Sequence, residues 1–371
     1  MRRPPTILHV SQPTDGGVSR YIEDAVADQA RRGWHVIVAA PAYGELAPGI
    51  TTAGAKHVEW TASRAPGPGS LLDTVQLARI VQRAQPSLVH LHSSKAGLAG
   101  RLAIRGRLPT VFQPHAWSFE AVSGPVRAGA LFWERRGARW AAAIVCVSEA
   151  ERRLGEEQGI AGRSRMIPNG VDLEAWPEAS GEERSAARRR LGLDEQPTVV
   201  CVGRLSRQKG QDVLLEAWPA VVAAVPEAQL VLVGDGPEEQ SLRESAGPAV
   251  RLVGKRADVA DWLAAADVTA FPSRWEGMSI GMLEAMARGR SVVASDVGGA
   301  HESLGGEAGA VVAPGDAAAL AAAIAARLQD PARAAAEGHA AREHAERSHD
   351  LRATTAALAA LYEELLAGPG P

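Results

Sequence analysis

The sequence contains one local pattern twice, in which a short run of β-branched residues leads into a polar loop with glycine and then into a helix. Near the start, the apolar run 7–10 is followed by the glycine pair 16–17, a helix predicted over 19–32 and a second apolar run at 36–39. The pattern restarts at residues 199–202. Strands that alternate with helices predict a mostly parallel sheet with helices on its faces. We therefore expect two doubly wound α/β domains.

The length and the charge pattern indicate where the two domains meet. At 371 residues the chain is too long for one ordinary core. A turn-rich segment at 166–172 is followed by the charged, weakly apolar run 180–190, and such segments are typical of domain boundaries. We predict an N-terminal domain over residues 1–178 and a C-terminal domain over residues 179–345.

Composition excludes several functional classes. The net charge of −3 argues against a general nucleic-acid binder, which needs a basic surplus. No segment approaches the roughly 18 apolar residues of a membrane-spanning helix. The only two cysteines, Cys146 and Cys201, lie in β-branched runs and read as buried small apolar residues rather than as metal ligands. We expect a cytoplasmic protein, with contact to the inner face of the membrane left open.

The stretch around Glu276 and Glu284 carries the clearest chemical signal. Apolar residues after Ser279 recur at the period of a helix packed on one face, so a helix should open at residues 277–279 with its amides free to bind an anion. Glu284 lies about five residues further, roughly 7–8 Å along the axis. This spacing fits a sugar nucleotide, with phosphate on the amides and hydroxyl groups on the two carboxylates. A surface helix whose glutamate complements the dipole is the alternative.

Two cations follow a predicted strand of the same domain. Arg204 and Lys209 lie in the loop after the run 199–202, where they could neutralise a diphosphate opposite the helix start. No Asp-x-Asp sequence occurs in the chain, so the sequence offers no sign of a carboxylate pair for a metal. Basic side chains and a helix dipole can bind a diphosphate without one, and we therefore predict no metal and no cofactor.

Polar residues also follow the strands of the first half. His90 and His92 end one predicted strand, and His115 follows another. Such positions face the ligand crevice of a doubly wound fold, which makes the loop with Ser94 and Lys95 a candidate site. The pair of histidines could bind a metal, but no third ligand is near in the sequence, so we predict no metal at this position.

Residues 124–140 combine four arginines with Phe132, Trp133 and Trp140. A basic amphipathic helix of this kind can lie on a membrane or bind an anionic acceptor. A helix with solvated arginines and a packed aromatic stripe is the commoner explanation.

Taken together, these motifs resemble those of the family 4 retaining glycosyltransferases, which have the GT-B fold of two Rossmann-like domains facing each other across a cleft. The resemblance runs over nearly the whole chain. Its specific part is the Glu276 and Glu284 pair with Arg204 and Lys209; the glycine pair at 16–17 and the turn at 168–172 are generic. In this fold the last helix, here residues 346–371, usually packs back on the N-terminal domain.

The resemblance implies roles for individual residues. Arg204 and Lys209 would hold the donor diphosphate, Glu276 the donor sugar and Glu284 the ribose. His115 would touch the transferred sugar, so that His115, Arg204, Lys209 and Glu276 form the implied catalytic group. The other implied contacts are Gly16 and Gly17 to the distal phosphate, Lys255 and Arg256 to the base, Gly277, Met278, Ser279 and Ile280 to phosphate, and Ser94, Lys95, His115 and Trp117 to the acceptor.

The expected activity is the transfer of a sugar, with retention and without a metal, from a nucleotide diphosphate sugar to an acceptor hydroxyl. Family frequency favours a UDP-sugar over a GDP-sugar. The acceptor could be lipid-linked, a polysaccharide or a small-molecule aglycone. Alternatives are a nucleotide-sugar 2-epimerase, a non-catalytic binding relative and a glycoside hydrolase that uses Glu276 and Glu284. The hydrolase leaves Arg204 and Lys209 without a role.

Overall fold

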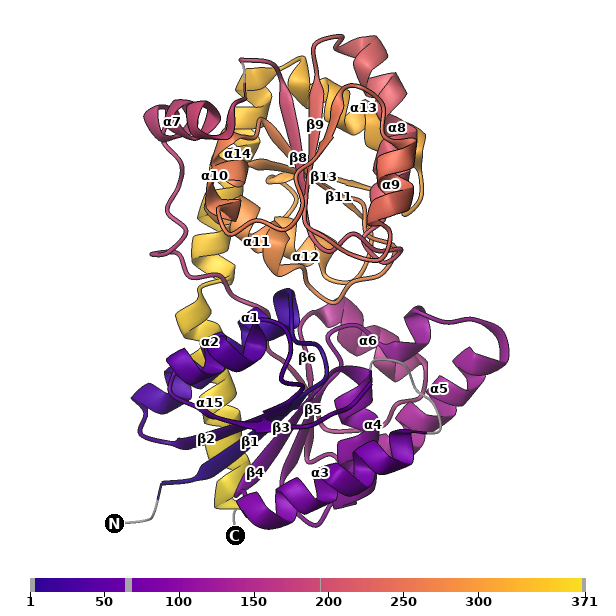
Figure 1. The fold of residues 1–371 in the computed structure, drawn as a ribbon, viewed down its shortest axis with the longest axis vertical. Coiled ribbons are helices and arrows are strands. Elements are labelled where there is room, and N and C mark those ends of the chain that lie inside the picture. Colours follow the sequence, from indigo (N-terminus) through magenta and orange to yellow (C-terminus); the bar gives the residue numbers. More distant parts are fainter. Residues whose placement is uncertain (1–3, 64–68, 194, 369–371) are drawn as a thin grey trace. The chain divides into compact units, whose positions relative to one another are not determined.

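The computed structural model describes residues 4–63, 69–193 and 195–368. Its internal contacts divide the chain into two compact units. One contains the chain up to Asn169 together with the segment from Arg352 onward, and the other runs from Gly170 to Leu351. Figure 1 shows that each unit is a sheet with helices packed against it.

The first unit is built on seven parallel strands in the order β3-β2-β1-β4-β5-β6-β7. The strands are β1 (Thr6–Ser11), β2 (His35–Ala40), β3 (Lys56–Glu59), β4 (Leu88–His92), β5 (Thr110–Gln113), β6 (Ala143–Cys146) and β7 (Ser164–Met166). The helices are α1 (Gly17–Arg31), α2 (Leu46–Thr52), α3 (Ser70–Ala84), α4 (Ser93–Ile104), η1 (Ser118–Glu120), α5 (Gly124–Ala138), α6 (Glu149–Glu157) and α15 (Leu351–Ala367).

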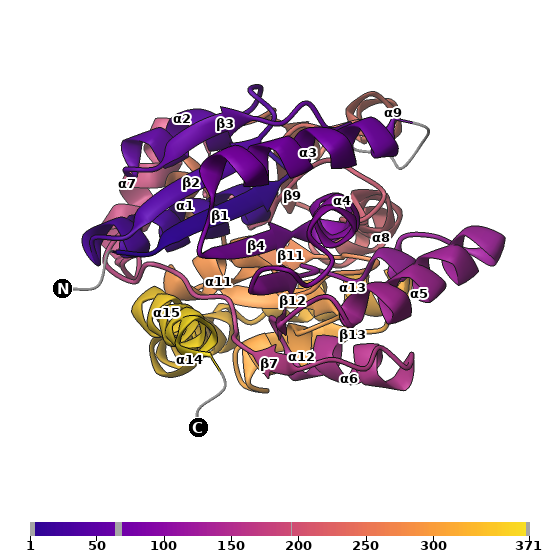
Figure 2. The same ribbon diagram turned by 90° about the horizontal axis from the view of Figure 1, so that it is seen from below.

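Side-chain alternation along β1 and β4 divides this unit into two layers. Leu8 and Leu91 belong to the apolar core together with residues of α3 and α4. The intervening residues point to the other face, where His9 contacts Gln29 of α1 and His90 contacts Tyr362 of α15. Figure 2 shows α15 on the opposite side of β1 and β4 from α3. Apolar side chains thus fill one face near the sheet centre, and imidazoles occupy the other.

The second unit has six parallel strands in the order β10-β9-β8-β11-β12-β13. The strands are β8 (Thr198–Val202), β9 (Gln229–Val233), β10 (Val250–Leu252), β11 (Val268–Phe271), β12 (Ser291–Ser295) and β13 (Gly309–Val312). The helices are α7 (Gly181–Leu191), α8 (Gln211–Ala224), α9 (Glu239–Ser245), α10 (Val259–Ala265), α11 (Ile280–Ala287), α12 (Ala300–Leu304), α13 (Ala317–Leu328) and α14 (Pro331–Ser348).

In both units the strand order reverses between the first and fourth strands, which places β1 beside β4 and β8 beside β11. In open parallel sheets, ligands bind beyond the carboxyl ends of the strands at this switch point. The loops after these four strands are therefore the positions where a functional site is expected. The two doubly wound sheets confirm the predicted fold class.

Local sequence explains where several helices of the second unit begin. Ser180 accepts a hydrogen bond from the Glu183 amide at the start of α7, and Asp316 and Asp330 cap α13 and α14 in the same way. Short polar side chains at this position satisfy amides that the helix itself leaves without a partner. The Asp316 and Asp330 caps mark where successive helices of the Ala-rich C-terminal segment begin.

The compact units divide after Asn169 and after Leu351, whereas the sequence predicted domain boundaries after residues 178 and 345. The segment before α7 belongs to the second unit, because the Ala179 amide donates to the Arg288 carbonyl and the Arg288 guanidinium donates to Pro177. At the other end, the Leu351 amide donates to Val171 within the second unit, and the first unit resumes at Arg352.

Candidate functional site

The loop after β8 is shaped by glycines that let it pack closely against its neighbours. Gly203 has a φ of 153°, and a Cβ atom at this position would lie 3.7 Å from the Lys209 side chain. Gly210, at the end of the loop, has a φ of 68°, and a Cβ atom there would collide with the Pro272 carbonyl at 2.0 Å. The contact at Gly203 is an ordinary one, so its φ is what favours glycine, whereas Gly210 is favoured by both its φ and the lack of space. The loop after β8 therefore lies directly against the loop after β11.

This packing brings Lys209 and Glu276 together from opposite sides of the switch point. The Lys209 ammonium forms an ion pair with Glu276 Oε2, and the Ser273 hydroxyl donates to the same oxygen at 3.4 Å. The two charged side chains are only 22% and 16% exposed, so their attraction is less screened than that of a surface pair. Two predicted site residues, 67 positions apart in the chain, thus meet in the structure.

The helix that follows Glu276 begins later than predicted. Ser279 has extended backbone angles (φ −76°, ψ 115°) and forms the N-cap, so α11 starts at Ile280 rather than within 277–279. The Ser279 side chain makes no capping hydrogen bond. Gly277 instead accepts a hydrogen bond from Gly299 at 2.7 Å. The first amides of α11 therefore receive no hydrogen bond from the Ser279 side chain. The start of a helix can bind an anion.

The other residues of this unit that were predicted to contact the donor differ in their exposure and in their partners. Arg204 is exposed, and its carbonyl accepts a hydrogen bond from Gln211 at 3.0 Å. Glu284 is half-buried on α11, and Met278 is buried. Arg256 forms an ion pair with Asp258 at 2.7 Å, which raises the pKa of the arginine. Lys255 is exposed beside it after β10.

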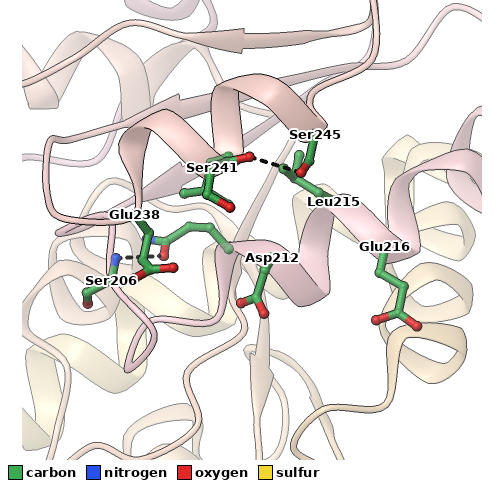
Figure 3. Close-up of a pocket in the computed structure, with 9 residues that line it drawn as sticks. Ser206, Asp212, Leu215, Glu216, Glu238, Ser241 and Ser245 are labelled. Carbon is green, nitrogen blue, oxygen red and sulfur yellow. Dashed lines mark hydrogen bonds between the residues drawn. The ribbon is translucent and has the colours of Figure 1, made fainter.

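One hollow of the second unit lies away from Lys209 and Glu276. It has a volume of about 290 Å³ and is lined by residues of the loop after β8, the loop before α9, and helices α8 and α9, including Asp212, Glu216 and Glu238 (Figure 3). A smaller hollow is lined by Ser273, Glu276 and Gly277 through Ser279. Of the predicted donor residues, Glu276 and residues 277–279 line the smaller hollow. The carboxylates of the other hollow do not favour a phosphate ligand.

In the first unit, the glycine pair forms the start of α1. Gly16 is the N-cap with a φ of 76°, Gly17 is the first helical residue, and both are exposed. A Cβ atom at Gly16 would meet no other atom within 4 Å. Backbone conformation, rather than crowding, thus explains glycine at position 16.

His115 lies at the carboxyl end of β5 in an unusual backbone conformation. Its φ is 54°, and that of Ala116 is 102°. The Ala116 amide donates to Glu151 at 2.8 Å, and the other oxygen of the same carboxylate accepts from Val147 at 2.8 Å. His115 as a whole residue is partly exposed, and its Nε2 atom lies 3.1 Å from Nδ1 of His92. Glu151 thus fixes the turn that presents His115.

The predicted acceptor residues divide into buried and accessible ones. Lys95 is 5% exposed and forms an ion pair with Asp73 at 2.7 Å. Trp117 is 2% exposed and donates to the Glu151 carbonyl. Both side chains are therefore committed inside the unit. Ser94, in the first turn of α4, and His115 are partly exposed.

Sequence reasoning missed the third member of a histidine cluster. His9, which is on β1, lies beside His90 of β4 in the strand register, and its Nδ1 atom is 2.9 Å from His92 Nε2. Ring nitrogens of His9, His90 and His92 all lie within 4.8 Å of one another. The i, i+2 spacing of His90 and His92 places both on one face, but only strand pairing shows that His9 joins them.

Burial keeps this cluster neutral near pH 7. It lowers the pKa of His9 to about 4 and that of His115 to about 3. Burial, followed by the neighbouring imidazoles, also lowers the pKa values of His90 and His92. A charged imidazole in this setting would have lost its hydration and would face similar charges.

The arginine-rich segment forms α5. Arg127, Arg135 and Arg136 are exposed, and Phe132 and Val126 are also 72% and 65% exposed. Within the described ranges of the chain, no helix combines the length and the apolar character needed to span a bilayer.

Two doubly wound parallel sheets in one chain are the architecture of the GT-B fold. HepE of Anabaena, in a crystal structure with UDP and glucose, aligns over 97% of this chain and 99% of its own, with a TM-score of 0.84 and 24% identity. At this identity the likeness concerns the fold alone.

Sequence comparison then identifies the family. Residues 15–175 match the family model described as Glycosyltransferase Family 4, and residues 196–330 match the one described as Glycosyl transferases group 1. A lipopolysaccharide core biosynthesis mannosyltransferase of Rhizobium meliloti is 31% identical over 255 residues, which cover 63% of this chain and 70% of the relative. The chain belongs to the family 4 glycosyltransferases.

A second relative is more similar over a shorter region. The GDP-mannose-dependent monoacylated alpha-(1-6)-phosphatidylinositol monomannoside mannosyltransferase of Corynebacterium glutamicum is 40% identical over 193 residues, or 48% of this chain. The alignment spans about half of that relative's length, 51%.

Proposed function

We propose that this protein transfers a sugar, with retention of anomeric configuration, from a nucleotide diphosphate sugar to an acceptor hydroxyl. The observation that carries the proposal is the meeting of Lys209 and Glu276 at the switch point of the second sheet, beside the uncapped start of α11. A cation, a carboxylate and the amides of a helix start are groups that can bind a diphosphate attached to a sugar.

Each group has a proposed role in this chemistry. Lys209 and Arg204 bind the diphosphate and stabilise the negative charge that develops when its bond to the sugar breaks. The first amides of α11 bind a phosphate oxygen, Glu276 binds sugar hydroxyls and Glu284 binds the ribose. In the first unit, His115 contacts the transferred sugar. The acceptor oxygen forms the new bond to the anomeric carbon, and its proton passes to the departing phosphate oxygen.

The names of the relatives change which nucleotide sugar we expect this protein to prefer. Family frequency favours UDP, whereas the relative with 40% identity is named for GDP-mannose. We therefore propose GDP-mannose as the preferred donor, with a UDP-sugar as the alternative. The same relative is named for a phosphatidylinositol mannoside acceptor, which makes a glycolipid hydroxyl the proposed acceptor class.

Binding of nucleotides by titration calorimetry tests the donor site directly. GDP and UDP would each be titrated into the wild-type protein and into Arg204→Ala, Lys209→Ala and Glu284→Ala. Arg207→Ala is the matched control, because Arg207 is an exposed cation of the same loop. We expect the three site variants to weaken binding by at least tenfold and the control to bind like wild type. If the wild type binds neither nucleotide, or the site variants bind unchanged, the proposal fails.

Turnover separates the transferase from other activities. With GDP-mannose and a phosphatidylinositol mannoside, we expect release of GDP and formation of an α-linked product, at the same rate with and without EDTA. Formation of a free 2-epimeric sugar in the absence of acceptor would identify an epimerase instead. Loss of activity with EDTA that added Mg²⁺ restores would contradict the metal-independent mechanism.

A glycolipid acceptor gives α5 a proposed role at a membrane surface. Its exposed arginines suit anionic head groups, and Phe132 suits the acyl boundary. The wild-type protein should sediment with vesicles of phosphatidylinositol and phosphatidylcholine, and Phe132→Ser should remain in the supernatant. Equal retention of both proteins, or no preference for anionic vesicles, would remove this role.

A further inference from the structure

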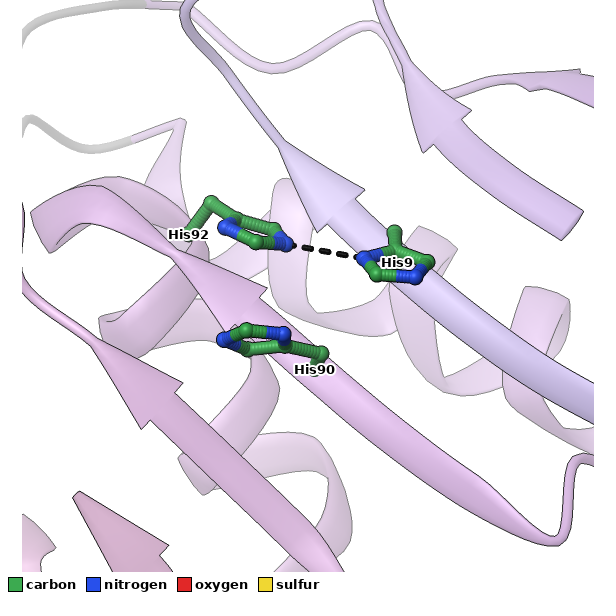
Figure 4. A group of neighbouring side chains, drawn as sticks. All are labelled: His9, His90 and His92. Carbon is green, nitrogen blue, oxygen red and sulfur yellow. Dashed lines mark hydrogen bonds between the residues drawn. The ribbon is translucent and has the colours of Figure 1, made fainter. Parts of the chain in front are cut away.

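The histidine cluster lies on the face of the first sheet that α1 and α15 cover. His9, His90 and His92 have no exposed surface, and Figure 4 shows their rings gathered between the ends of β1 and β4. The proposed function gives a role only to the neighbouring His115. Three buried imidazoles at the switch point otherwise have no explanation, since burial of polar rings is unfavourable unless they are hydrogen-bonded.

Hydrogen bonds connect these rings into a single line that ends at His115. The amide oxygen of Gln29 lies 2.9 Å from His9 Nε2, and His9 Nδ1 lies 2.9 Å from His92 Nε2. His92 Nδ1 then lies 3.1 Å from His115 Nε2. In each of the three rings, Nε2 faces the Gln29 end of the line. In His9 and His92, Nδ1 faces the His115 end.

The oxygen of Gln29 determines the direction of every proton in this line. Because that oxygen can only accept, His9 must carry its proton on Nε2 and leave Nδ1 as an acceptor. His92 must then donate from Nε2 and accept at Nδ1, and His115 must donate from Nε2. A neutral imidazole carries one proton, so Nδ1 of His115 is left as a lone-pair acceptor.

Tyr362 is a further hydrogen-bond partner of the Gln29 side chain. Burial raises the pKa of the Tyr362 hydroxyl, and a hydrogen bond from the Gln29 side chain opposes that effect. This is the direction expected when the amide NH₂ group donates to the tyrosine oxygen. The Tyr362 hydroxyl in turn lies 2.5 Å from His90 Nδ1. With its nitrogen toward Tyr362, the Gln29 side chain presents its oxygen to His9.

The distances favour hydrogen bonds over a shared metal ion. Two nitrogens bound to one tetrahedral zinc at about 2.05 Å lie roughly 3.3 Å apart. His9 Nδ1 and His92 Nε2 are closer than this, at 2.9 Å, which is an ordinary hydrogen-bond length.

We propose that Gln29, His9 and His92 form a relay that fixes the tautomer of His115. The Nδ1 atom of His115 can then accept a hydrogen bond from a hydroxyl group of the transferred sugar. Gln29, His9 and His92 are positioning residues, and only His115 touches the substrate. The part of the proposal that concerns the sugar rests on the proposed function. The tautomer itself is a property of the free protein.

Long-range ¹H–¹⁵N spectra of the full chain labelled on histidine test the relay. We expect His9, His92 and His115 of the wild-type protein to appear at neutral pH as neutral rings with the proton on Nε2. Gln29→Met removes the acceptor, so the His115 signal should shift toward the Nδ1–H tautomer. Gln29→Glu keeps an acceptor oxygen and should preserve the wild-type pattern. Gln76→Met, the same change at a half-buried residue of α3, is the matched control.

The outcomes distinguish the relay from the transferase activity. A wild-type spectrum with His115 protonated on Nδ1, or on both nitrogens, overturns the relay even if Gln29→Met does not fold. A stoichiometric metal whose removal by EDTA changes the His9 and His92 signals also overturns it. If the protein transfers sugar, Gln29→Met should lower kcat/KM roughly tenfold, about the effect of one hydrogen bond, with Gln29→Glu restoring it. If the spectra show the expected tautomers but the protein binds no nucleotide sugar, only the proposed function is refuted.

Discussion

At the scale of single residues, the turn at His115 and Ala116 has the least favourable backbone of the candidate site. Both residues have positive φ, at 54° and 102°, a region that side chains with a Cβ atom rarely adopt. The Glu151 carboxylate holds the Ala116 amide in this position at 2.8 Å. Strain of this kind is found where the surrounding structure imposes it and is commonly associated with function.

Ala116→Gly should therefore stabilise the first unit by about 1 kcal/mol, because glycine adopts a φ of 102° without steric strain. Calorimetric unfolding of the variant would measure the change. Ala121→Gly is the matched control, since Ala121 has an ordinary φ of −81° and should gain nothing. Equal effects of the two substitutions would show that Ala116 is not strained.

The ion pair of Lys209 and Glu276 gives a second prediction at this scale. Lys209→Ala should lower kcat/KM by roughly 100- to 1000-fold, because the departing diphosphate loses a positive charge directed at it. Arg207→Ala, on the same loop, should lower it less than threefold. Steady-state kinetics with GDP-mannose would compare them. Similar losses in both variants would indicate a general effect of positive charge instead of a specific contact.

At the scale of elements, α4 and α5 are joined by a fully buried ion pair. Arg101 and Glu134 are 0% and 1% exposed and lie 2.8 Å apart, and the guanidinium carbon lies 3.9 Å from the centre of the Phe112 ring. Gly137 allows this approach, since a Cβ atom there would be 3.0 Å from the guanidinium. Removing one partner would leave the other charge buried without compensation.

Glu134→Ala should consequently destabilise the first unit by about 3–5 kcal/mol. Glu156→Ala, which removes an exposed carboxylate paired with Arg152, should have an effect below about 1 kcal/mol. Urea denaturation followed by tryptophan fluorescence would measure both. A small effect of Glu134→Ala would mean that water reaches Arg101.

The histidines between β1, β4 and the loop after β5 predict a pH dependence of stability. Their pKa values are lower in the folded protein than the ordinary 6.5, to about 4 for His9 and about 3 for His115. At pH values between the folded and unfolded pKa, the unfolded chain binds more protons than the folded protein. The contribution of these rings to stability is therefore fully present above about pH 6.5 and is lost as the pH falls. Each such ring contributes about 1.4 kcal/mol per pH unit to the slope.

Urea midpoints measured between about pH 7 and pH 5 should therefore fall steeply in the wild-type protein. His9→Leu should reduce the slope by about one proton, whereas His35→Leu, at an exposed position on β2, should leave it unchanged. A stability that does not change over this range would show that the rings are charged in the folded protein.

At the scale of the whole molecule, the chain completes its first unit with its last helix. The segment from Arg352 onward belongs to that unit, and Tyr362, with no exposed surface, packs against Trp34 and hydrogen-bonds to His90. The first unit therefore includes contacts between residues 272 positions apart, and it cannot be completed until the second unit has been synthesised.

Tyr362→Ala should destabilise the first unit by about 3–5 kcal/mol through loss of a buried aromatic ring, while the second unit keeps its own stability. Calorimetry should then separate two unfolding transitions, of which only one has moved. Tyr362→Phe, which loses only the hydroxyl, should cost about 1 kcal/mol. A shift of both transitions by the same amount would show that the two units unfold together.

The sequence by itself determined the class of fold and pointed to the loops of the second unit as a candidate site. Apolar runs, glycine turns and helical periodicity are local signals, so they predicted two doubly wound sheets and identified Lys209 and Glu276 as candidates. The end of α11 was also predictable, because Gly289 adopts the positive φ, 70°, that a helix end favours.

Only the tertiary structure decided which residues meet. The pairing of β1 with β4 joins His9 to His90 and His92, and helix packing buries Lys95 and Trp117, which the sequence had suggested as acceptor contacts. The start of α11 at Ile280, later than the predicted 277–279, reflects the extended backbone of Ser279. Strand order and helix docking arise from contacts between distant segments, and no local pattern encodes them.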